Sequence, residues 1–132
     1  MPAALTSAVA LGYLRELSAD ITAAVLLDAA GERLAGPPAL HAAAAELLAH
    51  APPGPAELEG RTPAGAVFAA RDEHHQLVVT TGRFALPRLT RHDLVTTLAA
   101  LSGRAAAPRR TAPIEAPPHL VAALLRVTNG RH

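Results

Sequence analysis

The sequence has 132 residues, which suggests one domain, and half of them are apolar, which is enough to build a buried core. The formal net charge of +1 excludes a strong overall field toward nucleic acid or membrane. Because the sequence contains no cysteine, disulfides and thiol chemistry are excluded as well.

No segment has the pattern of an export signal or of a membrane span. Met1 leads directly into an alanine-rich amphipathic stretch without a basic start. The longest apolar runs are far too short to cross a bilayer. We therefore expect a cytoplasmic protein without a transmembrane segment.

The first expected element is a helix over residues 5–18. Apolar side chains recur at three- and four-residue spacing and share one face: Ala10, Leu11, Leu14, Leu17 and Ile21. The apolar run 21–28 is too short for a typical helix and predicts a strand buried on both faces. Asp28 and Gly31 then predict a turn, because aspartate can bond its own backbone and glycine tolerates a positive φ. Residues 32–36 complete a hairpin.

A second helix is expected to open at Pro37 and Pro38, where a missing N–H costs nothing. Its apolar stripe is Leu40, Ala44, Leu47, Leu48 and Ala51. The PPGP segment at 52–55 ends this helix and predicts a stiff connection.

Three strands are expected over 56–62, 65–71 and 76–82. In the first of them, residues alternate, so that Glu57, Glu59 and Arg61 point one way and Ala56, Leu58 and Gly60 the other. The other two strands are apolar on both faces. They are joined by Asp72–His75, which predicts a hairpin with a four-residue loop.

A third helix is expected to begin at Thr90 as N-cap. Asp93 lies three residues later, as in a capping box, and Leu89 and Leu94 occupy the positions of a hydrophobic staple. Gly103 predicts the C-terminal stop. Leu94, Leu98 and Leu101 line its apolar face.

The remaining chain is expected to form a Pro-, Ala- and Arg-rich linker at 104–117 and a C-terminal helix and tail at 118–132. Apolar residues of that helix share one side: Leu120, Val121, Leu124 and Leu125. Five arginines of the linker and tail are opposed only by Glu115: Arg104, Arg109, Arg110, Arg126 and Arg131. They predict a solvated segment, with contact to an anionic lipid or acidic partner as the alternative.

The densest group of possible metal ligands is Asp72, Glu73, His74 and His75. A zinc site needs three or four ligands that converge at about 2 Å from the ion. Adjacent histidines in an extended strand point to opposite faces, and no other histidine is placed by the pattern to join them. We therefore expect a solvated hairpin tip, and neither a metal nor a cofactor.

Catalytic patterns are missing from the sequence. No serine lies in a nucleophile-elbow pattern, no glycine-rich phosphate loop is present, and there is no lysine for a Schiff base. Arg83, Arg88, Arg91 and His92 form a basic group near the start of the third helix, where phosphate binding is the alternative to a solvated helix end. With few aromatic residues to stack on bases, a specific nucleic-acid reader is not expected.

The predicted order is helix, two strands, helix, three strands, helix, plus the C-terminal helix. It predicts an α+β fold, a three-layer α/β/α sandwich with a five-stranded antiparallel sheet. Over residues 5–103 this order resembles the Roadblock/dynein light-chain family, which has a profilin-like fold. The resemblance is carried by AAVLLDAAGERLAG, GAVFAARDEHHQLVVTTG and ALPRLTRHDLVTTLAAL. The proline-rich segment 52–55 and the helix after residue 117 depart from the family pattern.

The resemblance implies a Roadblock-like domain at 1–103 without catalytic residues. Members of the family are typically non-enzymatic, form homo- or heterodimers, and act as scaffolds or regulators of small Ras-like GTPases. The same role is implied here. The alternative is a PAS- or profilin-like small-molecule sensor, which would need a pocket between helix and sheet.

The expected sheet needs more cover than the second helix provides. Five strands at about 4.8 Å span roughly 24 Å, whereas a helix covers about 10 Å, so about half of one apolar face stays bare. Either a second copy or residues 118–128 must cover it. We predict a homodimer in which the second helix packs on its mate and strand 56–62 pairs with its copy near Glu59, setting Glu57 opposite Arg61. The predicted interface is Leu40, Ala43, Ala44, Leu47, Leu48, Glu57, Leu58, Glu59, Gly60 and Arg61.

Overall fold

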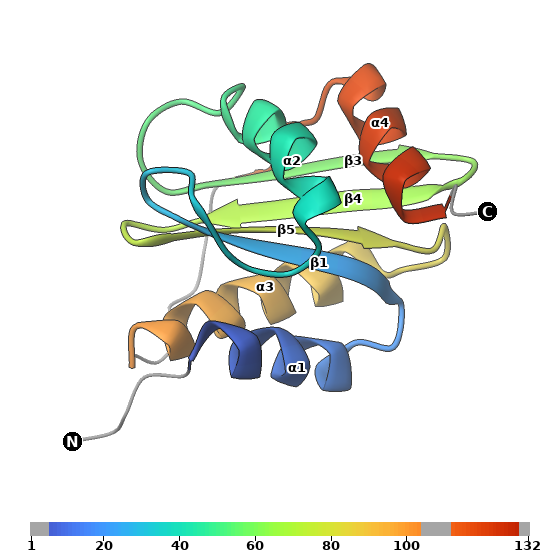
Figure 1. Ribbon diagram of the computed structural model, residues 1–132. Coiled ribbons are helices and arrows are strands. Elements are labelled where there is room, and N and C mark those ends of the chain that lie inside the picture. Colours follow the sequence, from blue (N-terminus) through green and yellow to red (C-terminus); the bar gives the residue numbers. More distant parts are fainter. Residues whose placement is uncertain (1–5, 104–111, 130–132) are drawn as a thin grey trace.

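A computed structural model describes residues 6–103 and 112–129 of the chain. These residues fold into two helical layers with a six-stranded, mostly antiparallel open sheet between them (Figure 1). The expected fold class is confirmed, including the order of the helices and of the five antiparallel strands. A sixth strand was not expected from the sequence.

The elements in chain order are α1 (Ser7–Leu17), β1 (Ile21–Asp28), β2 (Arg33–Ala35), η1 (Pro38–Leu40), α2 (His41–Leu48), β3 (Ala56–Thr62), β4 (Gly65–Arg71), β5 (His75–Thr81), α3 (Pro87–Leu101), β6 (Ile114–Glu115) and α4 (Pro118–Asn129). The sheet order is β2-β1-β5-β4-β3-β6. All neighbouring strands are antiparallel except β3 and β6, which are parallel.

One layer consists of α1 and α3, which lie side by side on the same face of the sheet (Figure 1). Their apolar faces meet Phe68 and Leu77 in a shared core. The predicted helix over 5–18 is shorter in the structure, since it begins after the N-cap Thr6 and ends at Leu17. Ile21 belongs to β1 rather than to the helix face, because the chain is already extended at Ser18 and Ile21 pairs with Thr81.

Helix α3 begins earlier than the sequence predicted. Pro87 stands in its first turn, and Thr90 is an interior helical residue with 2% of its surface exposed. The predicted Thr90 cap, the capping box with Asp93 and the hydrophobic staple are therefore wrong. The fixed φ and the missing N–H of proline suit the first helical position, so the helix can start there without a side-chain cap. The predicted stop is confirmed, since Gly103 has a φ of 70° just after the C-cap.

The opposite face of the sheet is covered by α2 and α4 (Figure 1). Leu47 of α2 and Leu124 of α4 share one core cluster with Leu58 and Val67 of the sheet, and all four are fully buried. The part of this face that α2 leaves bare is thus covered by the C-terminal helix of the same chain. The sequence left two possibilities for covering this face, a second copy or residues 118–128, and the structure has the second.

Strand β3 permits this close packing because position 60 has no side chain. A Cβ at Gly60 would lie 2.5 Å from Cγ2 of Val121 and 3.2 Å from the Cβ of Ala116. The neighbouring strand is similar, since a Cβ at Gly65 would lie 3.1 Å from Cδ2 of Leu125. The helix therefore rests almost on the backbone of β3 and β4.

The outer edge of β3 is partly occupied by β6. Ile114 lies opposite Leu58, Glu115 lies opposite Glu59, and the N–H of Ala116 donates to the carbonyl oxygen of Glu59 at 2.8 Å. The segment 104–117 that was predicted to be a linker therefore contains a strand. Its residues 104–111 lie outside the described part of the chain.

The proline-rich loop at 52–55 is tied to the sheet by one arginine. Arg71, the last residue of β4, donates to the carbonyl oxygens of Gly54 at 2.8 Å and Leu48 at 3.3 Å, and also to that of Pro52. This loop connects the end of α2 to β3. The proline-rich loop therefore leads into β3 without disrupting that strand.

Candidate functional site

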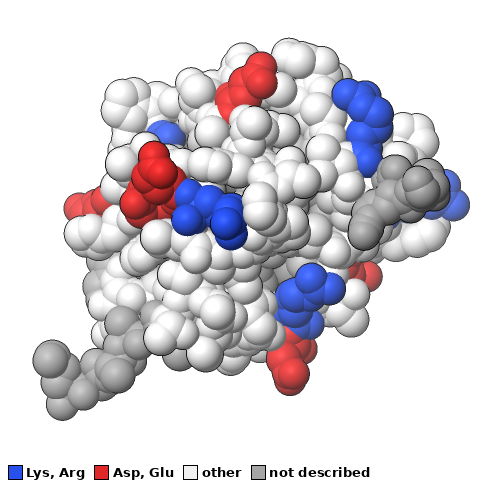
Figure 2. Space-filling view, in the orientation of Figure 1, with Lys and Arg blue, Asp and Glu red and all other residues white. Residues whose placement is uncertain are grey.

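Charged side chains do not form a large single-sign surface on the face seen in Figure 2. They lie there in small separate groups of both signs. This distribution agrees with the net charge of +1. A nucleic-acid interface would need a broad basic surface to contact successive phosphates, and this face does not offer one.

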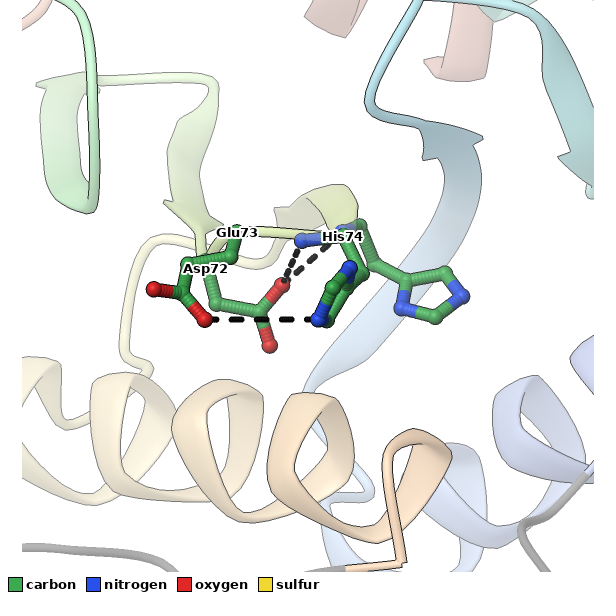
Figure 3. A network of polar contacts seen from close by, with 4 residues as sticks. Asp72, Glu73 and His74 are labelled. Atoms are coloured by element: carbon green, nitrogen blue, oxygen red, sulfur yellow. Dashed lines mark hydrogen bonds and ion pairs between the residues drawn. The ribbon is translucent and has the colours of Figure 1, made fainter.

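The acidic and histidine-rich segment between β4 and β5 is a tight hairpin turn (Figure 3). Oδ1 of Asp72 accepts hydrogen bonds from the backbone N–H groups of His74 and His75, both at 2.8 Å. The backbone N–H of Asp72 donates to the carbonyl oxygen of His75 at 3.0 Å. The predicted hairpin is confirmed, but its loop has three residues rather than the predicted four, because His75 already belongs to β5. Asp72 closes the turn.

Glu73 and His74 are directed to solvent, whereas His75 is half-buried at the start of β5. Nε2 of His74 lies 4.0 Å from Oε1 of Glu73, and 64% and 71% of the two side chains are exposed. Within residues 6–103 and 112–129, no three or more histidine, aspartate or glutamate side chains are grouped as metal ligands. The geometry at the turn is that of a solvated loop.

The first hairpin uses its aspartate in the same way. Oδ1 of Asp28 accepts from the N–H groups of Ala30 and Glu32, both at 2.9 Å, and Gly31 has a φ of 91°. Nε2 of His41 lies 2.7 Å from the carbonyl oxygen of Gly31, which ties the start of α2 to the turn. The predicted Asp28–Gly31 turn is confirmed, and both residues have a structural explanation.

The residues predicted to form the dimer interface come together on α2 and β3, but most of them are covered within the chain. Five belong to the core shared with α4: Leu40, Ala44, Leu47, Leu48 and Leu58. Ala43 packs partly buried against the same core, and Glu57 is 9% exposed. Gly60 lies beneath Val121. A symmetric dimer through these residues therefore requires α4 and β6 to leave their places.

The polar side of β3 is engaged with the layer of α3. Nη1 of Arg91 lies 3.5 Å from Oε1 of Glu59, and both side chains are largely buried. Arg61 donates to the carbonyl oxygens of Arg83 at 3.0 Å and Ala85 at 2.9 Å. The alternation predicted for β3 is thereby confirmed. Its arginine holds the loop that leads into α3.

That loop and the first turn of α3 carry a feature that the sequence reasoning missed. Phe84, Leu86 and Leu89 are 78%, 63% and 52% exposed, and they lie among the basic residues near the helix start. The staple predicted for Leu89 does not form. The signal was the alternation of arginine and large apolar residues in RFALPRL, but exposure depends on the tertiary structure.

One acidic side chain on α3 is buried. Asp93 is 5% exposed, and its Oδ2 has no hydrogen-bond partner in the described residues. Burial raises the pKa of this carboxyl group, and the charge of neighbouring His92 offsets part of the rise. A perturbed pKa in a cleft can mark a catalytic group, but in the described residues Asp93 belongs to no group of three or more possible metal ligands, and its neighbour His92 is exposed. We regard its burial as a cost to folding.

No protein-family model matches the sequence, and no curated protein matches it. In the described residues, no helix combines the length and the apolar character that a membrane span requires. A function therefore has to be argued from the fold and from the surface of the chain.

Proposed function

We propose that this chain is a non-enzymatic regulatory or scaffolding module that acts on a small Ras-like GTPase in the cytoplasm. The observation that carries the proposal is the architecture. Helices α1 and α3 lie on one face of an antiparallel β2-β1-β5-β4-β3 array, and α2 lies on the other. This arrangement agrees with the Roadblock-like organisation that the sequence pattern implies.

Asp28, which ends β1, and Asp72, which directly follows β4, have structural roles in the turns. Both accept hydrogen bonds from turn N–H groups, which explains their presence without chemistry. A module of this kind would act by shaping the site of its partner. The proposal therefore assigns no catalytic residue and no cofactor to this chain.

The homodimer stays a prediction, and it would have to replace contacts that are made inside one chain. Because α4 covers the face beside α2 and β6 occupies part of the edge of β3, the predicted symmetric contact competes with contacts inside one chain. Light scattering on the full chain measures the outcome directly. A mass of twice 13.6 kDa supports the dimer, and a monomer at micromolar concentration refutes it.

Calorimetry tests the partner. The chain is titrated into a Ras-like GTPase, the one encoded beside its gene where there is one, loaded with GDP or with a non-hydrolysable GTP analogue. We expect binding with an affinity that depends on the nucleotide. The absence of heat with both forms would contradict the proposal.

A control titration separates this function from the sensor alternative. The same nucleotides, added to the chain alone, should give no heat, because the proposal places the nucleotide site on the partner. The double variant His74→Ala, His75→Ala should bind the GTPase as the original chain does, since the hairpin tip is assigned no role. Direct nucleotide binding by the chain would favour a small-molecule sensor.

A further inference from the structure

The start of α3 presents an unusual concentration of exposed apolar side chains. Seven large apolar residues are exposed in the described part of the chain, and three of them lie between positions 84 and 89. These are Phe84, Leu86 and Leu89, and together with Arg83 and Arg88 we call them the 83–89 surface. Monomeric proteins rarely gather such side chains without a binding function.

The fold does not need these side chains for its own stability. The core face of α3 is provided by Leu94, Leu98 and Leu101, which are all buried. The loop before the helix is fixed by Ala85, which is 2% exposed and whose carbonyl oxygen accepts a hydrogen bond from Arg61. Phe84 and Leu86 flank this fixed point and are held outward.

The charges that this segment of the chain carries have one sign. The sequence contains no acidic residue between Glu73 and Asp93, and Arg83 and Arg88 are exposed. The guanidinium of Arg83 lies 4.8 Å from the ring centroid of Phe84, which keeps charge and aromatic ring together.

The helix start adds to this positive character. Leu86 provides no side-chain cap and the first turn has no acidic residue, so the positive end of the helix dipole is not neutralised there. His92 is exposed one turn further along α3.

Acidic groups from other elements do not reverse this balance. Asp20 is the acid that the hydrogen bonds place nearest, since its carbonyl oxygen accepts from the N–H of Gly82 at 3.2 Å. Glu59 is paired with Arg91 and does not oppose the exposed arginines. The two exposed arginines therefore outnumber the one acidic residue that a backbone hydrogen bond places near the segment.

We propose that the 83–89 surface docks on an anionic phospholipid membrane. Phe84, Leu86 and Leu89 enter the boundary between headgroups and acyl chains, and Arg83 and Arg88 contact lipid phosphates. A bilayer surface offers an apolar layer directly below a layer of negative charge, which matches an apolar cluster surrounded by arginines. A second copy fits less well, because a two-fold contact would bring the same arginines together.

The place of the surface in the molecule suits this occupant. The 83–89 segment follows β5 and lies at the end of the helical layer where α1 finishes and α3 begins (Figure 1). An end of the molecule can touch a membrane without burying the helix faces that pack on the sheet. The function depends on this local surface rather than on net charge, which is only +1.

Sedimentation with vesicles tests the proposal. The full chain is mixed with vesicles of phosphatidylcholine and phosphatidylserine in equal parts, and with vesicles of phosphatidylcholine alone. We expect clear binding to the anionic vesicles, much weaker binding to the neutral ones, and a decrease with added salt because the charge contacts are exposed. Absence of binding to the anionic vesicles, or equal binding to both kinds, overturns the proposal.

Two variants and their controls assign the contact to residues. The double variant Phe84→Ser, Leu86→Ser should lower the partition coefficient about tenfold or more, because most of the inserted apolar surface is lost. The control Leu34→Ser removes an exposed leucine from β2, outside this surface, and should leave binding unchanged. Arg83→Gln with Arg88→Gln should weaken binding to anionic vesicles, whereas Arg126→Gln on α4 should not. Equal effects of the test and control variants would refute the assignment.

Fluorescence tests insertion at the proposed position directly. The chain has no tryptophan, so Phe84→Trp introduces a single indole at the proposed point of insertion. We expect its emission to shift to shorter wavelength with anionic vesicles. If the chain sediments with vesicles but the emission stays unchanged, another surface makes the contact and the proposal fails. If Phe84→Ser, Leu86→Ser instead converts a dimer to a monomer, the surface joins two copies and the lipid assignment is wrong.

Discussion

The substitution Gly60→Ala tests whether α4 packs on β3 in solution. The φ of Gly60 lies outside the left-handed region, so alanine fits the backbone there. Without a neighbour above it, the new methyl group would stabilise the fold by about 0.4–1 kcal/mol, because it restricts the unfolded chain. The sign of the effect therefore depends on what lies over position 60.

In the structure the added Cβ would lie 2.5 Å from Cγ2 of Val121 and 3.2 Å from the Cβ of Ala116. Overpacking of a close-packed core costs about 1–3 kcal/mol. Subtracting the gain in the unfolded state leaves a net loss of about 0–2.6 kcal/mol in the free energy of unfolding, with its centre at about 1.3 kcal/mol. We expect this loss in urea unfolding followed by circular dichroism.

The substitution Val121→Ala supplies the matched background. It removes the methyl group that the new Cβ would strike, so Gly60→Ala should cost little there or even stabilise. The two substitutions should be non-additive by about 1 kcal/mol or more, as expected for residues in contact. If Gly60→Ala stabilises the chain to the same extent in both backgrounds, α4 does not lie on β3 and the reasoning is refuted.

Three further predictions concern the buried acid, the hairpin tip and the cover of the sheet. Because burial raises the folded-state pKa of Asp93, its contribution to stability is full at pH values below its unfolded pKa and is lost as the pH rises through the folded pKa. Asp93→Asn should therefore stabilise the chain at pH 7, and the gain should shrink toward pH 4 in paired urea titrations; a gain that grows on acidification would contradict this. The double variant His74→Ala, His75→Ala should change the free energy of unfolding by less than about 0.5 kcal/mol, and metal analysis should find no stoichiometric metal; one zinc per chain that disappears in the variant would overturn the turn assignment. A chain that ends at Gly103 lacks β6 and α4 and should self-associate more than the full chain in light scattering, because Leu58 and Val67 lose their cover; a folded truncated chain that stays monomeric would show that the cover is dispensable.

The strands and turns were predictable because their signals are local. The run 21–28 is apolar and too short for a helix, and Asp28 and Gly31 specify the turn that follows by their own chemistry. The start of α3 was missed because two valid start signals compete there, Pro87 and Thr90. The local sequence does not show which of the two residues starts the helix. The choice depends on the packing of Thr90 into the helical layer.

The missed parts of the C-terminal region depend on contacts far apart in the sequence. Ile114 and Glu115 form a strand only because the edge of β3 is free to accept them. The width of the sheet showed that a second cover was needed, but area does not tell which chain supplies it. Gly60 was the available clue, since a glycine inside a strand often marks the close approach of another segment.

The exposed apolar surface at 83–89 could be read only in part from the sequence. The arginines near the helix start are visible in the sequence, but Leu89 also fits the position of a staple, and Phe84 belongs to no periodic pattern. Exposure follows from where Ala85 is anchored, and Arg61, distant in the sequence, provides one of the bonds that anchor it. A surface of this kind becomes visible only when the fold is known.

Because α4 belongs to the same chain as β3 and β4, it has an advantage over a second copy in covering the sheet. A helix of the same chain competes for this face of the sheet at an effective concentration that its connecting segment sets. For a short connection this concentration is typically in the millimolar range. A second copy at micromolar concentration competes poorly for the same face unless it offers stronger contacts. Reciprocal exchange avoids this competition, because each α4 would pack over Gly60 of its neighbour as it packs over Gly60 of its own chain. Concentrated solutions of this chain should therefore favour exchanged pairs, and dilution should return the helix to its own sheet.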